Sequence, residues 1–132
     1  MRVLAVSSYA GLGGSELTFV TFLEHRPADA QVDVLLVSDG PLRERLEPLG
    51  LPVRVAEGGE GRPDLRMARS FHRQFREILA RGHYDVIWAL GQKAALLGAS
   101  AARTRRVPMM WHKVDFSWDW LLARPLGSRP RG

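Results

Sequence analysis

A run of small residues near the start of the chain has the composition of a loop that receives a phosphate or a sugar. Gly13 and Gly14 follow an apolar segment, and Ser15 and Glu16 open the amphipathic segment that comes next. Because glycine has no Cβ, a ligand can approach the backbone closely at these positions. A helix that begins there attracts an anion through its N–H groups and its dipole, and Ser15 is a suitable N-cap. The pattern predicts a site for a sugar or a phosphate-bearing ligand.

The residues of this loop leave more than one interpretation open. A phosphate loop of the P-loop type is excluded, because the segment lacks the lysine that such a loop requires. A dinucleotide-binding fingerprint would use Gly11 and Gly13, but Glu16 stands where its third glycine belongs. In that alternative Asp39, at the end of a predicted strand, would bind the ribose. A further alternative is that the glycines only turn the chain.

A second group of candidate side chains lies close to residue 112. His112, Lys113 and Asp115 offer an imidazole, an ammonium and a carboxylate that can bind hydroxyl groups or phosphate. A hydrogen-bonded surface histidine is the alternative for His112, and a solvated loop is the alternative for the other two. No pair of histidines has metal-ligand spacing and the chain has no cysteine, so we predict neither a metal nor a cofactor.

Apolar runs of strand length alternate with helical patterns, and this alternation determines where the candidate residues lie. Strands are predicted at residues 2–7, 32–38, 52–56, 85–90 and 107–112. Helices are predicted at residues 15–25, 42–49, 65–81 and 92–103. The order is typical of a doubly wound, Rossmann-like α/β domain with a mainly parallel sheet of about five strands. In such a sheet ligands bind beyond the carboxyl ends of the strands, where the glycine loop and His112 are both expected.

The predicted third helix has a clear division between apolar and basic residues. Its apolar stripe is predicted to contain Ala68, Phe71, Phe75, Ile78 and Leu79. Arginines at positions 66, 69, 73 and 76 fall mainly on the other faces. Asp64 is expected to cap the start of this helix, and Gly82 is expected to follow its end.

Length and composition limit the classes of protein that the chain can belong to. The 132 residues fit one domain, and 45% hydrophobic with 25% charged residues is typical of a globular chain. We expect a domain over residues 1–121 and a flexible Pro/Gly/Arg-rich tail over residues 122–132. The net charge of +5 comes almost entirely from arginine, as GC-rich coding also produces, and the predicted strands are apolar, so nucleic acid is not an expected partner. The absence of cysteine favours a cytoplasmic location.

Three segments together resemble a known enzyme family. They are "MRVLAVSSYAGLGGSE" at residues 1–16, "YDVIWALGQKAALLGASAAR" at residues 84–103 and "PMMWHKVDF" at residues 108–116. Their order and spacing are similar to those of the N-terminal domain of GT-B fold glycosyltransferases, in the large retaining family called family 4 or group 1. Gly13, Gly14, Ser15 and Glu16 match the Gly-Gly-x-Glu sequence of that family, and His112 matches the histidine that ends its fifth strand.

The resemblance implies a function for these residues. It implies transfer of a sugar from a nucleotide-sugar donor to a sugar or lipid-linked acceptor, with retained configuration and no obligatory metal. Gly13 and Gly14 would approach the donor diphosphate, with Ser15 and Glu16 beside them, and His112 would lie near the transferred sugar. Lys113 and Asp115 would join the substrate site.

The resemblance also implies a second domain that these residues do not include. In the family, the N-terminal domain mainly binds the acceptor and a C-terminal domain holds the donor. We therefore expect a truncated chain that is inactive without that domain, with peripheral contact to the inner face of the membrane through the arginines of the third helix. A dinucleotide-binding module and a non-catalytic interaction domain are the alternatives.

Overall fold

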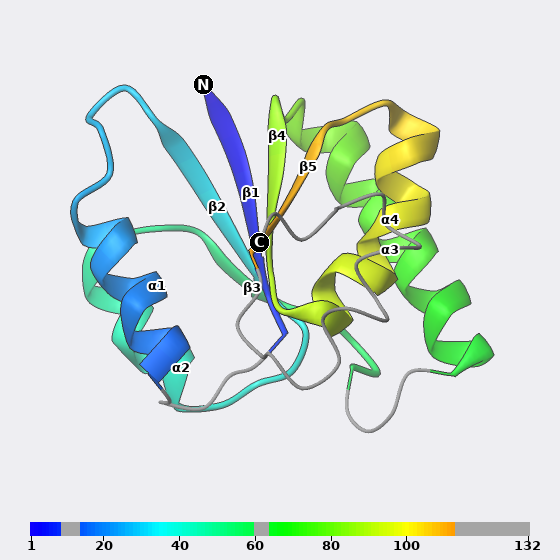
Figure 1. The fold of residues 1–132 in the computed structure, drawn as a ribbon, viewed down its shortest axis with the longest axis horizontal. Coiled ribbons are helices and arrows are strands. Elements are labelled where there is room, and N and C mark those ends of the chain that lie inside the picture. Colours follow the sequence, from blue (N-terminus) through cyan, green and yellow to red (C-terminus); the bar gives the residue numbers. More distant parts are fainter. Residues whose placement is uncertain (9–13, 60–63, 113–132) are drawn as a thin grey trace, which may run out of the picture.

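The computed structural model describes residues 1–8, 14–59 and 64–112, which form a single parallel sheet covered by helices on both faces (Figure 1). The sheet has five strands in the order β3-β2-β1-β4-β5. This arrangement confirms the predicted Rossmann-like α/β fold with its mainly parallel sheet. The predicted tail at residues 122–132 and the domain boundary at residue 121 lie outside the described residues.

The helices and strands follow one another along the chain as the hydrophobic pattern predicts. The strands are β1 (Arg2–Ser7), β2 (Gln31–Leu36), β3 (Val53–Val55), β4 (Val86–Leu90) and β5 (Met109–His112). The helices are α1 (Gly14–Glu24), α2 (Pro41–Leu46), the 3-10 turn η1 (Glu47–Leu49), α3 (Leu65–Gly82) and α4 (Gln92–Arg105).

The start of β5 shows how local chemistry shortens a predicted strand. The pattern predicts a strand from residue 107, but the Val107 N–H donates to the carbonyl oxygen of Ala102 at 2.9 Å and so closes the end of α4. Pro108 has no N–H, although its carbonyl accepts from Ile87 at 2.8 Å. The regular strand therefore begins at Met109.

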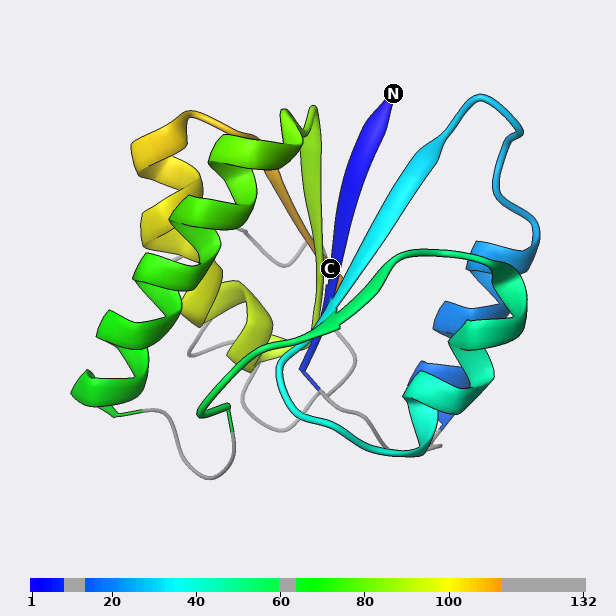
Figure 2. The same cartoon turned by 180° about the vertical axis from the view of Figure 1, so that it is seen from behind.

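Each face of the sheet buries its own apolar core. Successive side chains of a strand point to opposite faces, so Leu4 and Val6 pack toward α3 and α4 while Ala5 packs toward α1. Figures 1 and 2 show α1 and α2 together on one side of the sheet, with α3 and α4 together on the other. Right-handed crossovers place the two helix pairs on opposite faces. The reason is that the strands are added in one direction from β1 to β3 and in the opposite direction from β1 to β4 and β5.

Helix α3 confirms one predicted end and corrects other details. The Asp64 side chain accepts from the Met67 N–H at 2.8 Å, which is the predicted N-cap. Met67 is buried and Ala68 is exposed, so the apolar stripe starts one residue earlier than predicted. The helix includes Gly82, and His83 closes it in the left-handed conformation with φ 51°.

Candidate functional site

The carboxyl ends of β1, β4 and β5 meet at one edge of the sheet, and hydrogen bonds hold them together. The Ser8 N–H donates to the carbonyl oxygen of Leu90 at 2.9 Å. The Gly91 N–H donates to the carbonyl oxygen of His112 at 3.0 Å. These bonds bring the end of β1, the start of α4 and His112 to the same edge, and α1 follows β1 in the chain.

The glycine loop is described only where it enters the helix. Helix α1 begins at Gly14, so the backbone of Ser15 lies inside the first turn. The prediction that Ser15 is the N-cap of this helix is therefore wrong. The first residue of the pair, Gly13, lies outside the described residues, as do Lys113 and Asp115. Their assignment to substrate binding stays a prediction.

Glu16 lies in the first turn of α1 and is almost completely buried. Its exposed fraction is 5%, and the residue has an interaction partner. A carboxylate in the first turn is favoured by the helix dipole. A group this deeply buried presents little surface to a ligand, so we expect Glu16 to hold the loop in place rather than to contact substrate directly.

His112 ends β5 with its imidazole packed against an aromatic row. Its ring centre is 6.1 Å from that of Trp88 on β4. The Trp88 ring centre in turn lies 5.0 Å from that of Phe19 and 5.4 Å from that of Phe22, both on α1. Aromatic packing at these distances fixes ring orientation. The half-buried imidazole is thus positioned from two sides, by its own strand and by the row that reaches α1.

One structural residue of this edge was missed by the sequence patterns. Helix α4 has Gly91 at its N-cap position, with no side chain to accept a hydrogen bond. The Ser8 hydroxyl takes that role, since its Oγ accepts from the Ala94 N–H at 2.7 Å. Gly91 has φ 93° and ψ 165°, a conformation that is essentially restricted to glycine. No local signal could reveal the cap, because its two partners are 86 residues apart.

Replacing Ser8 with alanine should lower the free energy of unfolding by about 1–2 kcal/mol, as the loss of an N-cap does. Ser8 is 4% exposed, so water cannot readily replace the lost acceptor for the Ala94 N–H. Urea unfolding followed by circular dichroism measures the change. Thr104→Ala is the matched control, since that exposed hydroxyl donates to the Ser100 carbonyl oxygen within α4. Equal stability of S8A and the native chain would contradict the capping role.

The ribose-binding role of Asp39 in the dinucleotide alternative is weakened by its contacts. Asp39 Oδ1 accepts from the Gly40 N–H at 2.9 Å, and Oδ2 pairs with Arg43 at 3.4 Å. The residue lines a cavity of about 340 Å³ beyond β2 and β3, together with Gly58 and Gly59. Both carboxylate oxygens are thus already engaged in a local turn.

Neither a metal cluster nor a membrane span is present in the described part of the chain. No three His, Asp or Glu side chains in residues 1–8, 14–59 and 64–112 are grouped so that they could hold a metal ion. Over the same residues, every helix is too short or too polar to cross a bilayer.

Sequence comparison identifies curated relatives that act on a lipid-linked acceptor. Residues 13–132 match the family described as "Glycosyl transferase 4-like domain". The UDP-N-acetylglucosamine--N-acetylmuramyl-(pentapeptide) pyrophosphoryl-undecaprenol N-acetylglucosamine transferases of Mycobacterium sp. strains KMS and JLS are each 36% identical over 95 residues. That match covers 72% of this chain and 24% of each relative. The chain therefore spans about a quarter of the length of these relatives.

Solved structures share the same fold. HepE of Anabaena, solved in complex with UDP-glucose, is 27% identical with a TM-score of 0.65, covering 85% of this chain and 29% of its own. MurG of Acinetobacter baumannii is 18% identical with a TM-score of 0.71, covering 93% of this chain and 38% of its own, and at that identity it shows the fold alone. The GT-B resemblance of the sequence is confirmed by these matches. Since the family match extends over most of its residues, the chain belongs to the glycosyl transferase 4-like family.

Proposed function

We propose that this chain is an acceptor-side part of an enzyme that transfers a sugar from a UDP-sugar to a sugar or lipid-linked acceptor. The observation that carries the proposal is the meeting of the β1 end, the α4 start and His112 at one carboxyl edge. Ligands of open parallel sheets bind at this edge. The donor class follows from the HepE complex with UDP-glucose, and the lipid-linked acceptor follows from the names of the mycobacterial relatives.

The chemistry of the edge suits a departing diphosphate. Sugar transfer leaves negative charge on the diphosphate, and preorganised N–H donors stabilise charge as it develops. The start of α1 supplies a helix N-terminus there, and the imidazole of His112 supplies a group that can donate to or accept from a sugar hydroxyl. We propose that transfer retains the anomeric configuration. We further propose that it requires a donor-binding domain, so this chain alone is inactive.

Titration of the full chain with UDP-glucose, UDP-N-acetylglucosamine and NAD tests the proposal. In amide NMR spectra we expect the UDP-sugars to shift Gly91, His112 and the start of α1, with millimolar affinity because these residues alone supply only one side of the proposed site. NAD should leave these amides unshifted. Tight binding of NAD, with shifts around Asp39, would establish the dinucleotide alternative instead.

A basic groove on the outer side of α3 and α4 supports contact with an anionic membrane. The groove has a volume of about 390 Å³ and brings together His72, Arg73, Arg76, Arg81 and Arg105, with Glu77 as its acidic residue. We propose that this face rests on anionic lipid and so places the chain at the inner face of the membrane, where a lipid-linked acceptor is available. Each basic side chain near an anionic bilayer contributes about 1 kcal/mol to the free energy of membrane binding.

The double variant Arg73→Gln/Arg76→Gln should bind vesicles of phosphatidylglycerol and phosphatidylcholine roughly 30-fold more weakly than the native chain. Sedimentation of the chain with the vesicles at low salt gives the partition coefficient. Arg43→Gln/Arg45→Gln removes the same charge from exposed positions of α2, across the sheet, and should bind like the native chain. An equal loss in both variants would show that net charge alone drives the binding.

A further inference from the structure

A further pocket lies at the opposite edge of the sheet, where the strands begin. Its volume is about 380 Å³, within the range of small-molecule sites. Leu4 and Leu35 belong to its lining and are themselves buried, while Pro52 and Ile78 add partly exposed apolar surface. The pocket forms where the end of α3 passes the start of β2 and β3. It shares no residue with the candidate sugar-transfer site, and the family resemblance assigns it no role.

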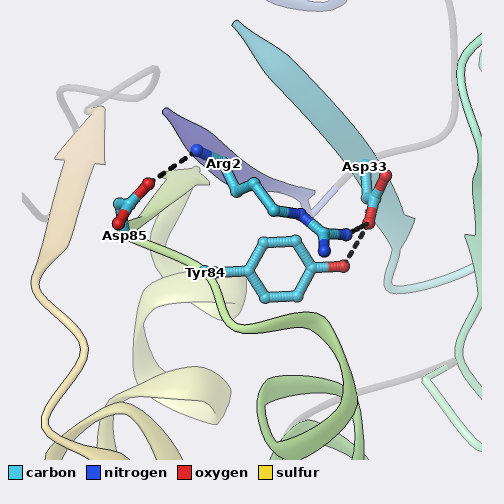
Figure 3. Close-up of polar contacts among 4 residues, drawn as sticks. All are labelled: Arg2, Asp33, Tyr84 and Asp85. Carbon is cyan, nitrogen blue, oxygen red and sulfur yellow. Dashed lines mark hydrogen bonds and ion pairs between the residues drawn. The ribbon is translucent and has the colours of Figure 1, made fainter.

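Three residues from distant parts of the chain build one polar side of this pocket (Figure 3). Arg2 Nη2 lies 3.2 Å from Asp33 Oδ2, and the Tyr84 hydroxyl donates to the same oxygen. The Arg2 guanidinium lies 5.2 Å from the centre of the Tyr84 ring. Burial, followed by the contact with Asp33, raises the pKa of Tyr84 to about 12. The phenol is therefore neutral at pH 7, and the charge of Asp33 is balanced by Arg2.

Two further arginines line the pocket without a carboxylate partner. Arg54 comes from β3 and Arg81 from the last turn of α3, and both are exposed. Neither forms an ion pair with a carboxylate in residues 1–8, 14–59 and 64–112. The lining thus holds three guanidinium groups and one carboxylate, which leaves two positive charges beside apolar surface. Such a combination is complementary to a dianion that carries a carbon skeleton.

We propose that this pocket binds a small organic phosphate, with the phosphate group between Arg54 and Arg81 and the carbon skeleton against Pro52 and Ile78. The planar fork of arginine matches phosphate oxygens in pairs of hydrogen bonds. A phosphate monoester carries roughly two negative charges at pH 7. This charge would balance the two uncompensated positive charges of the lining. A simple carboxylate carries one charge and would leave the other guanidinium unpaired.

The test uses the full chain, with phenyl phosphate, inorganic phosphate and benzoate as probes. Isothermal titration at low salt should give tighter binding of phenyl phosphate than of inorganic phosphate, because only the former covers the apolar lining. Phenyl phosphate should also bind more tightly than benzoate, because benzoate carries a single negative charge. Amide NMR should place the shifts at Tyr84, in β3 and at the end of α3. Equal affinity for all three probes, or shifts confined to Gly91 and His112, would overturn the proposal.

Matched variants separate the pocket from general charge attraction. Arg54→Gln/Arg81→Gln should weaken phenyl phosphate binding at least tenfold. Arg43→Gln/Arg45→Gln, with the same change in net charge on α2, should leave it within twofold of the native value. All four arginines are exposed, so both double variants should keep the native circular dichroism spectrum. An equal loss in the two variants would refute a built site.

Discussion

Replacing Phe75 with alanine should lower the free energy of unfolding by about 3–5 kcal/mol, the range for a fully buried aromatic side chain. Phe75 has no exposed surface and lies 5.9 Å, between ring centres, from Phe71 on the same helix. Its ring also packs against Gly98 of α4. A Cβ added at Gly98 would be 3.0 Å from the Phe75 ring and 3.1 Å from the Met109 methyl. The ring thus packs against the backbone of Gly98, and its removal should leave a cavity between the two helices.

Urea unfolding measures the effect, with an unchanged dependence on denaturant as evidence that unfolding stays cooperative. Phe22→Ala is the matched control, because that residue is 64% exposed and its ring centre lies 5.4 Å from that of Trp88. We expect it to cost at most about 1 kcal/mol. Similar losses in the two variants would show that α3 and α4 do not form the principal core. Since small domains are stable by about 5–15 kcal/mol, F75A should lose a large part of the total.

The fold could be predicted because each strand and helix carries its own periodicity. Strands buried on both faces read as continuous apolar runs, as in the segment Val3–Val6, and parallel pairing then requires helices between them. Even β3, with three regular residues, was located by its apolar run after Pro52. Helix ends were less accurate, because His83 and Arg106 adopt left-handed φ angles of 51° and 56° at positions where glycine or asparagine is usual.

The contacts that organise the two edges could not be predicted, since they join residues far apart in the sequence. Ser8 caps α4 across 86 residues, and Tyr84 reaches Asp33 across 51. Each residue alone is an ordinary serine, aspartate or tyrosine, and only the sheet order brings it to its partner. The position of His112 was predictable in contrast, because the end of a parallel strand is fixed by the topology.

Replacing His112 with alanine should lower the rate of sugar transfer about 100-fold, as the loss of a positioned acid, base or hydrogen-bond donor does. The imidazole is held at the carboxyl edge by β5 and by its packing on Trp88, so its geometry is set before substrate arrives. The measurement needs a two-domain enzyme, which joining this chain to the donor-binding half of a relative would provide. Transfer from radiolabelled UDP-N-acetylglucosamine to a lipid-linked acceptor gives kcat and KM separately.

Two further variants make the histidine result specific. His25→Ala removes an exposed imidazole whose ring nitrogen Nδ1 lies 2.9 Å from the Thr21 carbonyl oxygen in α1, and it should leave kcat unchanged. His112→Gln keeps a hydrogen-bond donor, but its amide cannot act as a general acid or base. Recovery of most of the rate in H112Q would mean that His112 orients the sugar, whereas a rate as low as that of H112A would mean that it transfers a proton. A folded H112A enzyme with native kcat would show that His112 takes no part in the reaction. The proposed role of the carboxyl edge would then rest on its helix N-termini alone.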